Sequence, residues 1–297
     1  MDRREFLGRA AKAAVAAGLA RDVIGSEAIA KEVHSVSNSE LKKGLTFSML
    51  PDDLSIEDRF KLAKDVGFDG VEAPPVTDTK ETEAMRLAAE KAGVEIHSVI
   101  FGGWGKPLSS GDPQTAEEGV ELVRQGLRGA KEMGADCLLL VPAVVNAETR
   151  YKDAYERSQK GIRQALAQAK ELGVRIAVEN VWNNFLLSPL EFARYVDELD
   201  SPYLRAYFDV GNVVAFGWPE DWIRTLGRRI LKIHLKDFKK DTREWKNLRD
   251  GDVNWIEVRK ALDEVGYKGY MTAELPGGDA EYLRDVASRI DKIIAGE

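Results

Sequence analysis

The sequence predicts an α/β protein whose main domain is a single (β/α)8 TIM barrel, and three observations support this class. Short apolar runs alternate with longer segments in which apolar residues recur at three- and four-residue spacing, the period of an amphipathic helix. Several helical segments end at a glycine directly before the next apolar run, as in Ala92-Gly93-Val94 and Leu172-Gly173-Val174, and glycine is common at helix C-termini. There are eight such apolar runs, and eight parallel strands with right-handed crossovers favour closure into a barrel.

The elements follow from this alternation. Strands are expected at Leu45–Leu50, Gly70–Ala73, Val94–Phe101, Cys137–Val141, Arg175–Glu179, Arg205–Asp209, Leu231–Leu235 and Tyr270–Glu274. Helices are expected at Ile56–Val66, Glu81–Ala92, Ala116–Met133, Tyr155–Leu172, Pro189–Leu199, Trp255–Val265 and Ala280–Ile293. An open doubly wound sheet is the alternative, but no Gly-x-Gly-x-x-Gly follows the first strand, and Gly102-Gly-Trp-Gly105 lacks that spacing.

The composition argues against several classes of protein. The 297-residue chain has a formal net charge of −7 and no run of basic residues, which argues against nucleic acid as a partner. No apolar stretch reaches the roughly 18 residues that a membrane-spanning helix needs. The single cysteine, Cys137, excludes an intrachain disulfide and cysteine-based zinc motifs, and its apolar surroundings predict burial.

Residues 1–30 resemble a twin-arginine export signal. Arg3-Arg4 precedes Phe6-Leu7, a weakly apolar stretch follows, and Ala28-Ile-Ala30 offers a small-residue cleavage site. The resemblance implies that the twin-arginine export machinery is a partner and that the protein acts in the periplasm or elsewhere outside the cytoplasm. The alternatives are an alanine-rich helix packed on the barrel or a disordered segment, with the protein then in the cytoplasm.

The signal-like segment, a polar stretch after it and the strand–helix alternation set the expected domain boundaries. Residues 31–43 are polar and are expected to form a linker, and residues 44–297 are expected to form the barrel.

Four polar residues end or nearly end consecutive strands in the second half of the barrel. They are Glu179, Asp209, His234 and Glu274. Because barrel enzymes carry their chemistry at the C-terminal ends of the strands, the four side chains should converge. A strand-terminal acid is by itself more often a helix cap or turn former, but four on successive strands are hard to explain in that way.

Three carboxylates and an imidazole cannot share one site without a cation, because like charges at close range repel. The set therefore predicts one divalent metal ion held by Glu179, Asp209, His234 and Glu274. Its oxygen-rich chemistry favours Mn²⁺, Mg²⁺ or Co²⁺, with Zn²⁺ as an alternative.

Five segments carry a resemblance to a known family. They are Val178-Glu-Asn180, Phe208-Asp-Val-Gly-Asn212, His234-Leu-Lys-Asp237, Gly251-Asp-Val-Asn-Trp255 and Thr272-Ala-Glu274. This ordered set resembles the xylose-isomerase-like barrel superfamily and, within it, the sugar-phosphate isomerase/epimerase branch that includes the ketose 3-epimerases. The resemblance implies a carbohydrate substrate, the same four metal ligands, and an acid/base pair formed by Glu179 and Glu274.

The chemistry of such a site is isomerisation or epimerisation through an enediolate. A metal bound to the carbonyl and hydroxyl oxygens would stabilise the enediolate, while one carboxylate removes the proton and another returns it. The chain departs from the ketose 3-epimerase pattern at three positions, where Asn212 replaces a histidine, Phe185 an acid and Lys240 an arginine. The metal centre is therefore kept while the substrate contacts are altered.

Further candidates for substrate binding lie near the predicted barrel mouth. They are Glu72, His97, Trp104, Lys106, Asn212 and Lys236. For Glu72 a cap or turn role is an alternative, and for His97 a hydrogen-bonded position inside the barrel. Lys236 and its neighbour Asp237 could instead form a surface ion pair.

Other functions remain open for the same sequence. A keto-polyol dehydratase or lyase shares the first step, and a non-catalytic sugar-binding barrel would share the fold. A nuclease with a trinuclear zinc site is disfavoured because the chain has three histidines and an acidic charge. The sequence does not decide which sugar is bound, whether it is phosphorylated, or whether the protein is a homo-oligomer.

Overall fold

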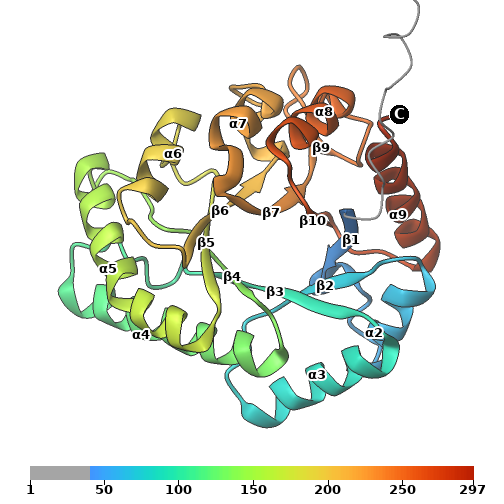
Figure 1. Ribbon diagram of the computed structural model, residues 1–297, viewed down its shortest axis with the longest axis horizontal. Coiled ribbons are helices and arrows are strands. Elements are labelled where there is room, and N and C mark those ends of the chain that lie inside the picture. Colours follow the sequence, from blue (N-terminus) through green and yellow to red (C-terminus); the bar gives the residue numbers. More distant parts are fainter. Residues whose placement is uncertain (1–40) are drawn as a thin grey trace, which may run out of the picture. The chain divides into compact units, whose positions relative to one another are not determined.

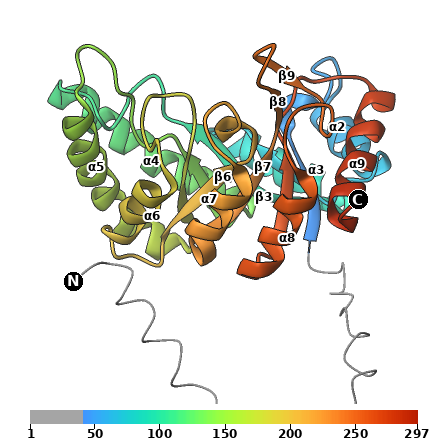
Figure 2. The ribbon, with the colours of Figure 1, turned by 90° about the horizontal axis from the view of Figure 1, so that it is seen from above.

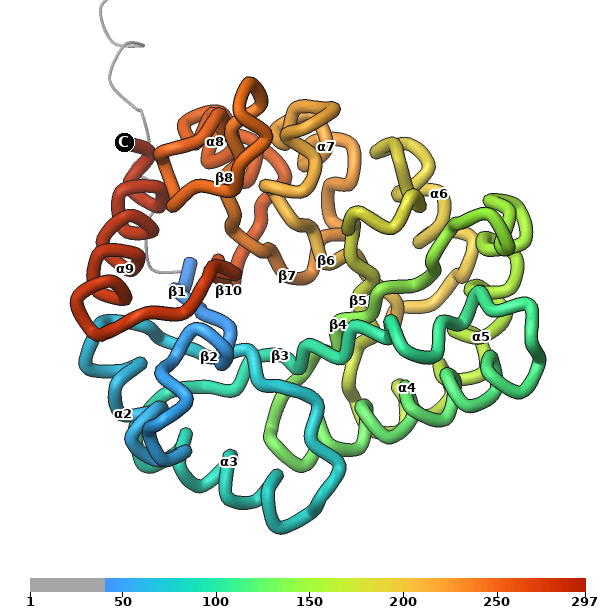
Figure 3. Tube along the Cα trace, turned by 180° about the vertical axis from the view of Figure 1, so that it is seen from behind, coloured from blue at the N-terminus to red at the C-terminus, as the bar shows by residue number. Residues whose placement is uncertain are grey.

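The computed structural model describes residues 41–297, so the predicted signal segment and most of the predicted linker lie outside the described residues. Eight parallel strands form a closed barrel in the order β1-β10-β7-β6-β5-β4-β3-β2, with helices around it (Figure 1). The same ring of strands is seen from the other side in Figure 3. The predicted (β/α)8 barrel is confirmed.

The barrel strands lie close to their predicted ranges. They are β1 Leu41–Thr46, β2 Gly70–Ala73, β3 Glu95–Gly102, β4 Cys137–Leu140, β5 Arg175–Glu179, β6 Leu204–Asp209, β7 Ile230–Leu235 and β10 Gly269–Ala273. The helices are α2 Ile56–Asp65, α3 Thr79–Ala92, α4 Pro113–Met133, α5 Tyr151–Leu172, α6 Pro189–Asp197, α7 Pro219–Leu226, α8 Trp255–Val265 and α9 Ala280–Ala295. Three single turns of 3-10 helix are η2 Phe47–Met49, η3 Gly211–Val213 and η4 Gly227–Arg229.

Local sequence signals set the helix ends. Ser55, Asp78 and Asp112 each precede a helix and accept a hydrogen bond from a backbone N–H of its first turn. Gly93 and Gly173 end α3 and α5 in the left-handed conformation, with φ of 68° and 70°. The glycines before the strands therefore act as the sequence predicts.

The structure differs from the predicted elements at three places. Strand β1 begins at Leu41, inside the range expected to be a linker, because Leu41 to Leu45 pair with β10. The second half of the strand predicted at Leu45–Leu50 forms the helical turn η2 instead. Helix α7 and a hairpin were not expected from the sequence. The hairpin, β8 Asp237–Lys239 with β9 Glu244–Lys246, stands beyond the end of β7 (Figure 2).

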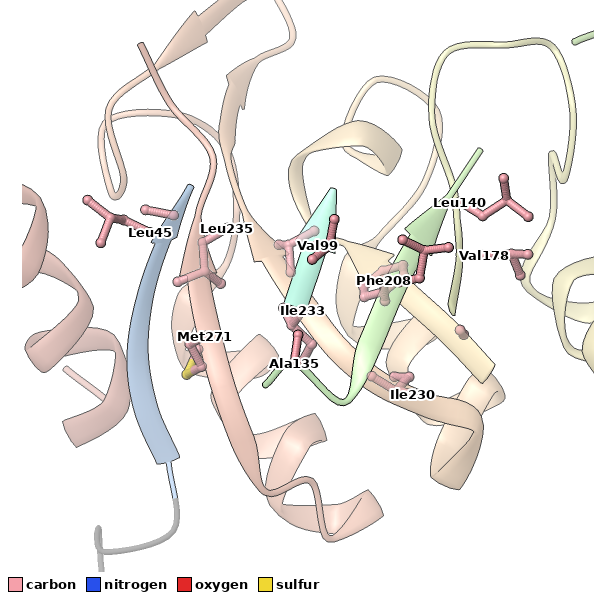
Figure 4. Close-up of a cluster of buried hydrophobic side chains, with 14 of the residues drawn as sticks. Leu45, Val99, Ala135, Leu140, Val178, Phe208, Ile230, Ile233, Leu235 and Met271 are labelled. Atoms are coloured by element: carbon pink, nitrogen blue, oxygen red, sulfur yellow. The ribbon is translucent and has the colours of Figure 1, made fainter. Parts of the chain in front are cut away.

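The alternation of side chains along the strands separates two buried regions. Val178, Phe208 and Ile233 belong to the large apolar cluster that includes the helices around the barrel (Figure 4). Ala177 and Tyr207, their neighbours along β5 and β6, belong to a small separate cluster inside the barrel. Because successive strand residues point to opposite faces, Glu179 and Asp209 point inward, two positions beyond Ala177 and Tyr207.

Nowhere in residues 41–297 is there a helix with the length and apolar character needed to cross a membrane.

Candidate metal centre

The four predicted ligands meet at the C-terminal ends of β5, β6, β7 and β10. One ligand atom from each of Glu179, Asp209, His234 and Glu274 lies within 4.8 Å of all the others. Asp209 and His234 are directly paired in the register of β6 and β7, and Glu274 is the first residue after β10. Three of the four residues are buried, and Glu274 is partly exposed, which leaves the cluster one open side.

His234 is held from both sides of its ring. Nδ1 lies 2.8 Å from Glu179 Oε1 and 2.8 Å from Glu274 Oε2, while Nε2 lies 2.6 Å from Glu72 Oε2. Because Nε2 is held by Glu72, Nδ1 is the nitrogen presented to the other ligands. Burial lowers the pKa of His234, but Glu274, Glu72 and Glu179 together raise it well above its usual range.

Glu72 is placed behind the cluster and not in contact with a substrate cavity. It is fully buried, and its second carboxylate oxygen accepts a hydrogen bond from the Ser98 hydroxyl. This differs from the substrate contact expected from the sequence. The arrangement is the one that fixes the tautomer of metal-binding histidines, in which the second ring nitrogen is held by a carboxylate.

Asn180 and Asn212 fix the end of strand β6. Asn180 donates to the Asp209 carbonyl at 3.0 Å and accepts from the Asp209 N–H at 2.9 Å. The Asn212 N–H donates to Asp209 Oδ1 at 2.7 Å, and its side-chain amide donates to the Asn180 carbonyl at 2.9 Å. Asp209 Oδ2 is thus the oxygen that remains free to face the cluster.

The donor set fits a divalent cation. Asp209 Oδ2 and Glu274 Oε2 are buried, and no donor in residues 41–297 gives either of them a well-directed hydrogen bond. Both are close to the Lys236 ammonium, at 3.2 and 2.7 Å. Buried carboxylate oxygens need a positive charge or directed donors, and three carboxylates with one imidazole are a ligand set that Mn²⁺, Mg²⁺ or Co²⁺ accepts.

In the metal-free protein the pKa values of Glu179 and Glu274 are shifted in opposite directions. Burial raises the pKa of Glu179 to about 7, although His234 opposes the shift. Burial also acts on Glu274, but His234 and Lys236 outweigh it and lower the pKa of Glu274 to about 2. Two carboxyl groups with separated pKa values beside one substrate position can act as different partners in proton transfer.

A cavity of 240 Å³ opens over this cluster, and we call it the central cavity. Its lining includes Glu179, Glu274, Lys236, Asn212 and three tryptophans, Trp104, Trp182 and Trp245. The tryptophans are about half exposed, and the Trp182 and Trp245 rings lie 5.1 Å apart. The structure therefore places Trp104, Asn212 and Lys236 of the predicted substrate-binding set at this cavity.

Lys106 and His97 are not brought to the central cavity. Lys106 forms an ion pair with Glu118 at 2.6 Å. His97 lies near the N-terminal ends of the strands, where its ring stacks on Tyr270 at 4.0 Å and burial lowers its pKa well below the usual range. The position of His97 is that of a packed barrel residue, since strand β3 begins only two residues earlier.

Sequence reasoning missed Trp182 and Trp245 as cavity residues. Trp182 lies three residues after Glu179, so its closeness to a strand end was a signal that could have found it. Trp245 comes from the β8–β9 hairpin, which has no recognisable strand pattern. Asp237 anchors this hairpin, because its carboxylate accepts from the Trp255 indole at 2.9 Å and from two loop N–H groups.

The fold and the cluster define a (β/α)8-barrel protein with a carboxylate–imidazole centre at the C-terminal ends of its strands. Residues 60–293 match the family described as xylose isomerase-like TIM barrel, and this match covers well over half of the chain. The protein belongs to that family.

Two relatives are named as sugar-phosphate epimerases. The putative L-ribulose-5-phosphate 3-epimerase SgbU of Escherichia coli (strain K12) is 29% identical over 250 residues, 78% of this chain and 87% of that protein. The L-ribulose-5-phosphate 3-epimerase UlaE of Escherichia coli O157:H7 (strain EC4115 / EHEC) is 26% identical over 278 residues, 86% and 97% of the two chains.

Two solved structures share the fold. D-psicose 3-epimerase from Clostridium cellulolyticum H10, with D-tagatose, has a TM-score of 0.72 and 17% identity, covering 84% of this chain and 97% of that one. The 3-keto-D-glucoside 4-epimerase YcjR from E. coli has a TM-score of 0.73 and 14% identity, covering 85% and 99%.

Proposed function

We propose that this protein is a divalent-metal-dependent epimerase of a ketose or ketose derivative that acts through an enediolate of the sugar. The observation that carries the proposal is the convergence of Glu179, Asp209, His234 and Glu274 within 4.8 Å beneath an open cavity. The names of the relatives support a sugar as the substrate and epimerisation as the reaction.

Each residue of the cluster has a distinct role in this proposal. Glu179, Asp209, His234 and Glu274 would hold the cation, which would stabilise negative charge on the sugar oxygens during proton removal. Glu179 and Glu274 come from β5 and β10, which two other strands separate in the barrel. They can therefore flank a sugar, one removing the proton next to the carbonyl and the other returning it.

Lys236, whose ammonium contacts Asp209 and Glu274, would keep the carboxylates charged and donate to a sugar oxygen. Tryptophan faces lining the cavity supply the apolar surface on which a sugar ring packs.

The experiment that tests the proposal is proton exchange in D₂O. The protein is stripped of metal, reloaded separately with Mn²⁺, Co²⁺ or Mg²⁺, and incubated with a panel of ketoses, with NMR as the readout. We expect deuterium at carbon 3 together with the carbon-3 epimer, dependent on metal. Glu179→Gln and Glu274→Gln should each lower the exchange rate by at least about 100-fold, the usual contribution of a general acid or base.

The other outcomes are equally informative. Deuterium with loss of a hydroxyl group would replace the epimerase by a dehydratase, and exchange at carbon 1 would replace it by an aldose–ketose isomerase. Tight metal binding without exchange on any ketose in the panel would contradict an enzymatic role for the cluster on these sugars.

A further inference from the structure

A second cavity adjoins the central cavity, and we call it the loop cavity. Its volume is 390 Å³, and it shares Val181, Trp182 and Asn212 with the lining of the central cavity. None of the four predicted metal ligands, all in the described part of the chain, lines it. The two cavities are therefore adjacent, and of the two it is the central cavity whose lining includes residues of the carboxylate–imidazole cluster.

The loop cavity has an apolar and aromatic lining. Beyond the shared residues it is formed by Phe185, Leu186, Leu187 and Phe216, with Asn184 at its polar side. Leu187 and Phe216, which both line this cavity, are each 53% exposed, so the cavity presents large apolar side chains to solvent. Such a lining fits the faces of a ring and not a strongly hydrated head group.

The loop that forms this cavity is held in a strained conformation. Leu186 has a φ of 54°, in the left-handed region that large apolar residues seldom adopt, and Asn184, with a φ of 58°, is of a residue type that adopts it more readily. Hydrogen bonds hold the strain in place, since Leu186 N–H donates to the Tyr151 hydroxyl at 3.0 Å and Leu187 N–H to Glu191 at 3.1 Å. Strained loops persist where the surroundings fix them, and they concentrate at ligand sites.

The indole of Trp182 is fixed between the two cavities. Its N–H donates to the Asn212 carbonyl at 2.8 Å, and its ring packs edge-on against Phe238 at 5.5 Å. Because the polar edge is already bonded, Trp182 offers a ligand the apolar surface of its ring, beside the Trp245 ring 5.1 Å away. A ligand that extends from the central cavity into the loop cavity passes this ring.

The charges argue against a phosphate in the loop cavity. Arg243 is the single cationic residue in its lining within the described chain, whereas tight phosphate binding uses several directed donors. A phosphate group placed in the loop cavity would therefore meet one cationic side chain among the described residues.

We propose that the substrate is a sugar carrying a second ring, as in a disaccharide or an aryl glycoside, and that the loop cavity binds this ring. This inference rests on the proposed epimerase function, because it assigns the first sugar to the central cavity. The proposed substrate therefore differs from L-ribulose 5-phosphate, the sugar phosphate in the names of the two relatives.

Three ketoses that differ at oxygen 6 alone provide the test. They are D-fructose, D-fructose 6-phosphate and isomaltulose, which carries a glucosyl group there, and all three have a free hydroxyl at carbon 3. Binding to the Co²⁺-loaded protein is measured by calorimetry and by tryptophan fluorescence, and proton exchange at carbon 3 is measured in D₂O. We expect isomaltulose to bind about tenfold more tightly than fructose, which corresponds to about 1.4 kcal/mol.

Two variants in the loop cavity and one control outside it test which residues bind the second ring. Leu187→Ser removes an apolar residue from the loop cavity, and Phe216→Ala removes its aromatic ring. Leu190→Ser is the control, because Leu190 is 74% exposed and does not line the cavity. Leu187→Ser and Phe216→Ala should remove most of the preference for isomaltulose over fructose, and Leu190→Ser should keep it.

Three results would overturn the inference. They are equal affinities for fructose and isomaltulose, a preference for fructose 6-phosphate, and a preference for isomaltulose that Leu187→Ser and Phe216→Ala leave intact. Failure of the epimerase proposal gives a different result, because isomaltulose would then still bind more tightly while no proton exchange occurred. Exchange without any preference for a second ring would keep the epimerase and reject the loop cavity as its ring site.

Discussion

His234 meets carboxylates on both ring nitrogens, and this double contact separates two roles that sequence spacing cannot separate. Glu179 and Glu274 face Nδ1, on the side of the cluster, while Glu72 holds Nε2 from a fully buried position. The first two therefore belong to the group that would contact a cation directly. Glu72 acts on the cation only through the orientation and basicity of the imidazole.

This difference gives a graded prediction for metal affinity. His234→Ala removes a ligand and should abolish stoichiometric binding, whereas Glu72→Gln should weaken binding by about 10- to 100-fold, the usual cost of losing a partner of a metal-bound histidine. Calorimetric titration of the metal-free proteins with Co²⁺ or Mn²⁺ measures both. Lys106→Ala is the control and should bind like the wild type, since Lys106 pairs with Glu118 away from the cluster. Wild-type affinity in His234→Ala would contradict the ligand assignment.

The raised pKa of Glu179 predicts how the metal-free protein responds to pH. Burial brings this pKa from 4.5 to about 7, so between these values the folded state binds more protons than the unfolded state. The contribution of Glu179 to the free energy of unfolding therefore falls as pH rises from about 4.5 to about 7, and it changes little above that range.

Urea unfolding of the EDTA-treated wild type and Glu179→Gln at pH 5, 6, 7 and 8 measures this effect. The free energy of unfolding of the wild type minus that of the variant should decrease up to pH 7 and then level off. A difference that stays constant over the series would show that the Glu179 carboxyl does not titrate in this window.

The convergence of the four candidate ligands could be predicted from the sequence because each lies late in a strand or directly after it, and strand ends meet in a parallel barrel. Glu72 shares that position at the end of β2, so its residue type and spacing could not distinguish a residue at the cavity from one behind His234. Only the register across the barrel interior places it opposite Nε2. Lys106 follows β3 in the same loop as Trp104, but its ammonium pairs with Glu118 of α4 and it does not line the central cavity.

At the scale of elements, the β8–β9 hairpin depends on one carboxylate. Asp237 accepts hydrogen bonds from the N–H groups of Arg249 and Val253 and from the Trp255 indole, and it thereby joins the hairpin to helix α8. Asp237→Ala would leave these donors unpaired and should lower the free energy of unfolding by about 2–4 kcal/mol. Urea denaturation measures the loss, with Asp241→Ala as a matched control on the exposed hairpin turn.

The Asp241→Ala change should stay within about 0.5 kcal/mol of the wild type, as is usual for exposed positions. Because Trp245 is carried by the same hairpin, Asp237→Ala should also weaken sugar binding in the central cavity. A loss no larger than that of Asp241→Ala would remove the anchoring role of Asp237.

The elements missed by the sequence analysis share a physical cause. Helix α7 has eight residues and each hairpin strand has three, so none extends far enough for an apolar period to be recognised. Long helices such as α4 and α5 carry several turns of that period and end at glycine, so their last residues were predicted, while their predicted starts fall three and four residues late. Of these missed elements the hairpin contributes Trp245 to the central cavity, so the sequence could not place this one wall of the cavity.

At the scale of the whole molecule, we propose that residues 1–30, outside the described residues, direct export of the folded barrel. A metal centre assembled from four strands exists only after folding, and a route for folded proteins would preserve it. Replacing Arg3 and Arg4 by lysine should leave unprocessed protein inside the cell, as seen by fractionation and N-terminal sequencing. A mature wild-type protein that still begins at Met1 or Asp2 would contradict cleavage.

Barrel closure joins β1 to β10, strands from opposite ends of the described chain. The ring thus depends on contacts of very large sequence separation, which slow folding. During synthesis the edge of β1 stays unpaired until the last strand leaves the ribosome, and an unpaired edge is where chains aggregate. Glu274 emerges at that same late moment, so under the proposed ligand set a nascent chain would lack its fourth ligand, and metal loading would follow synthesis.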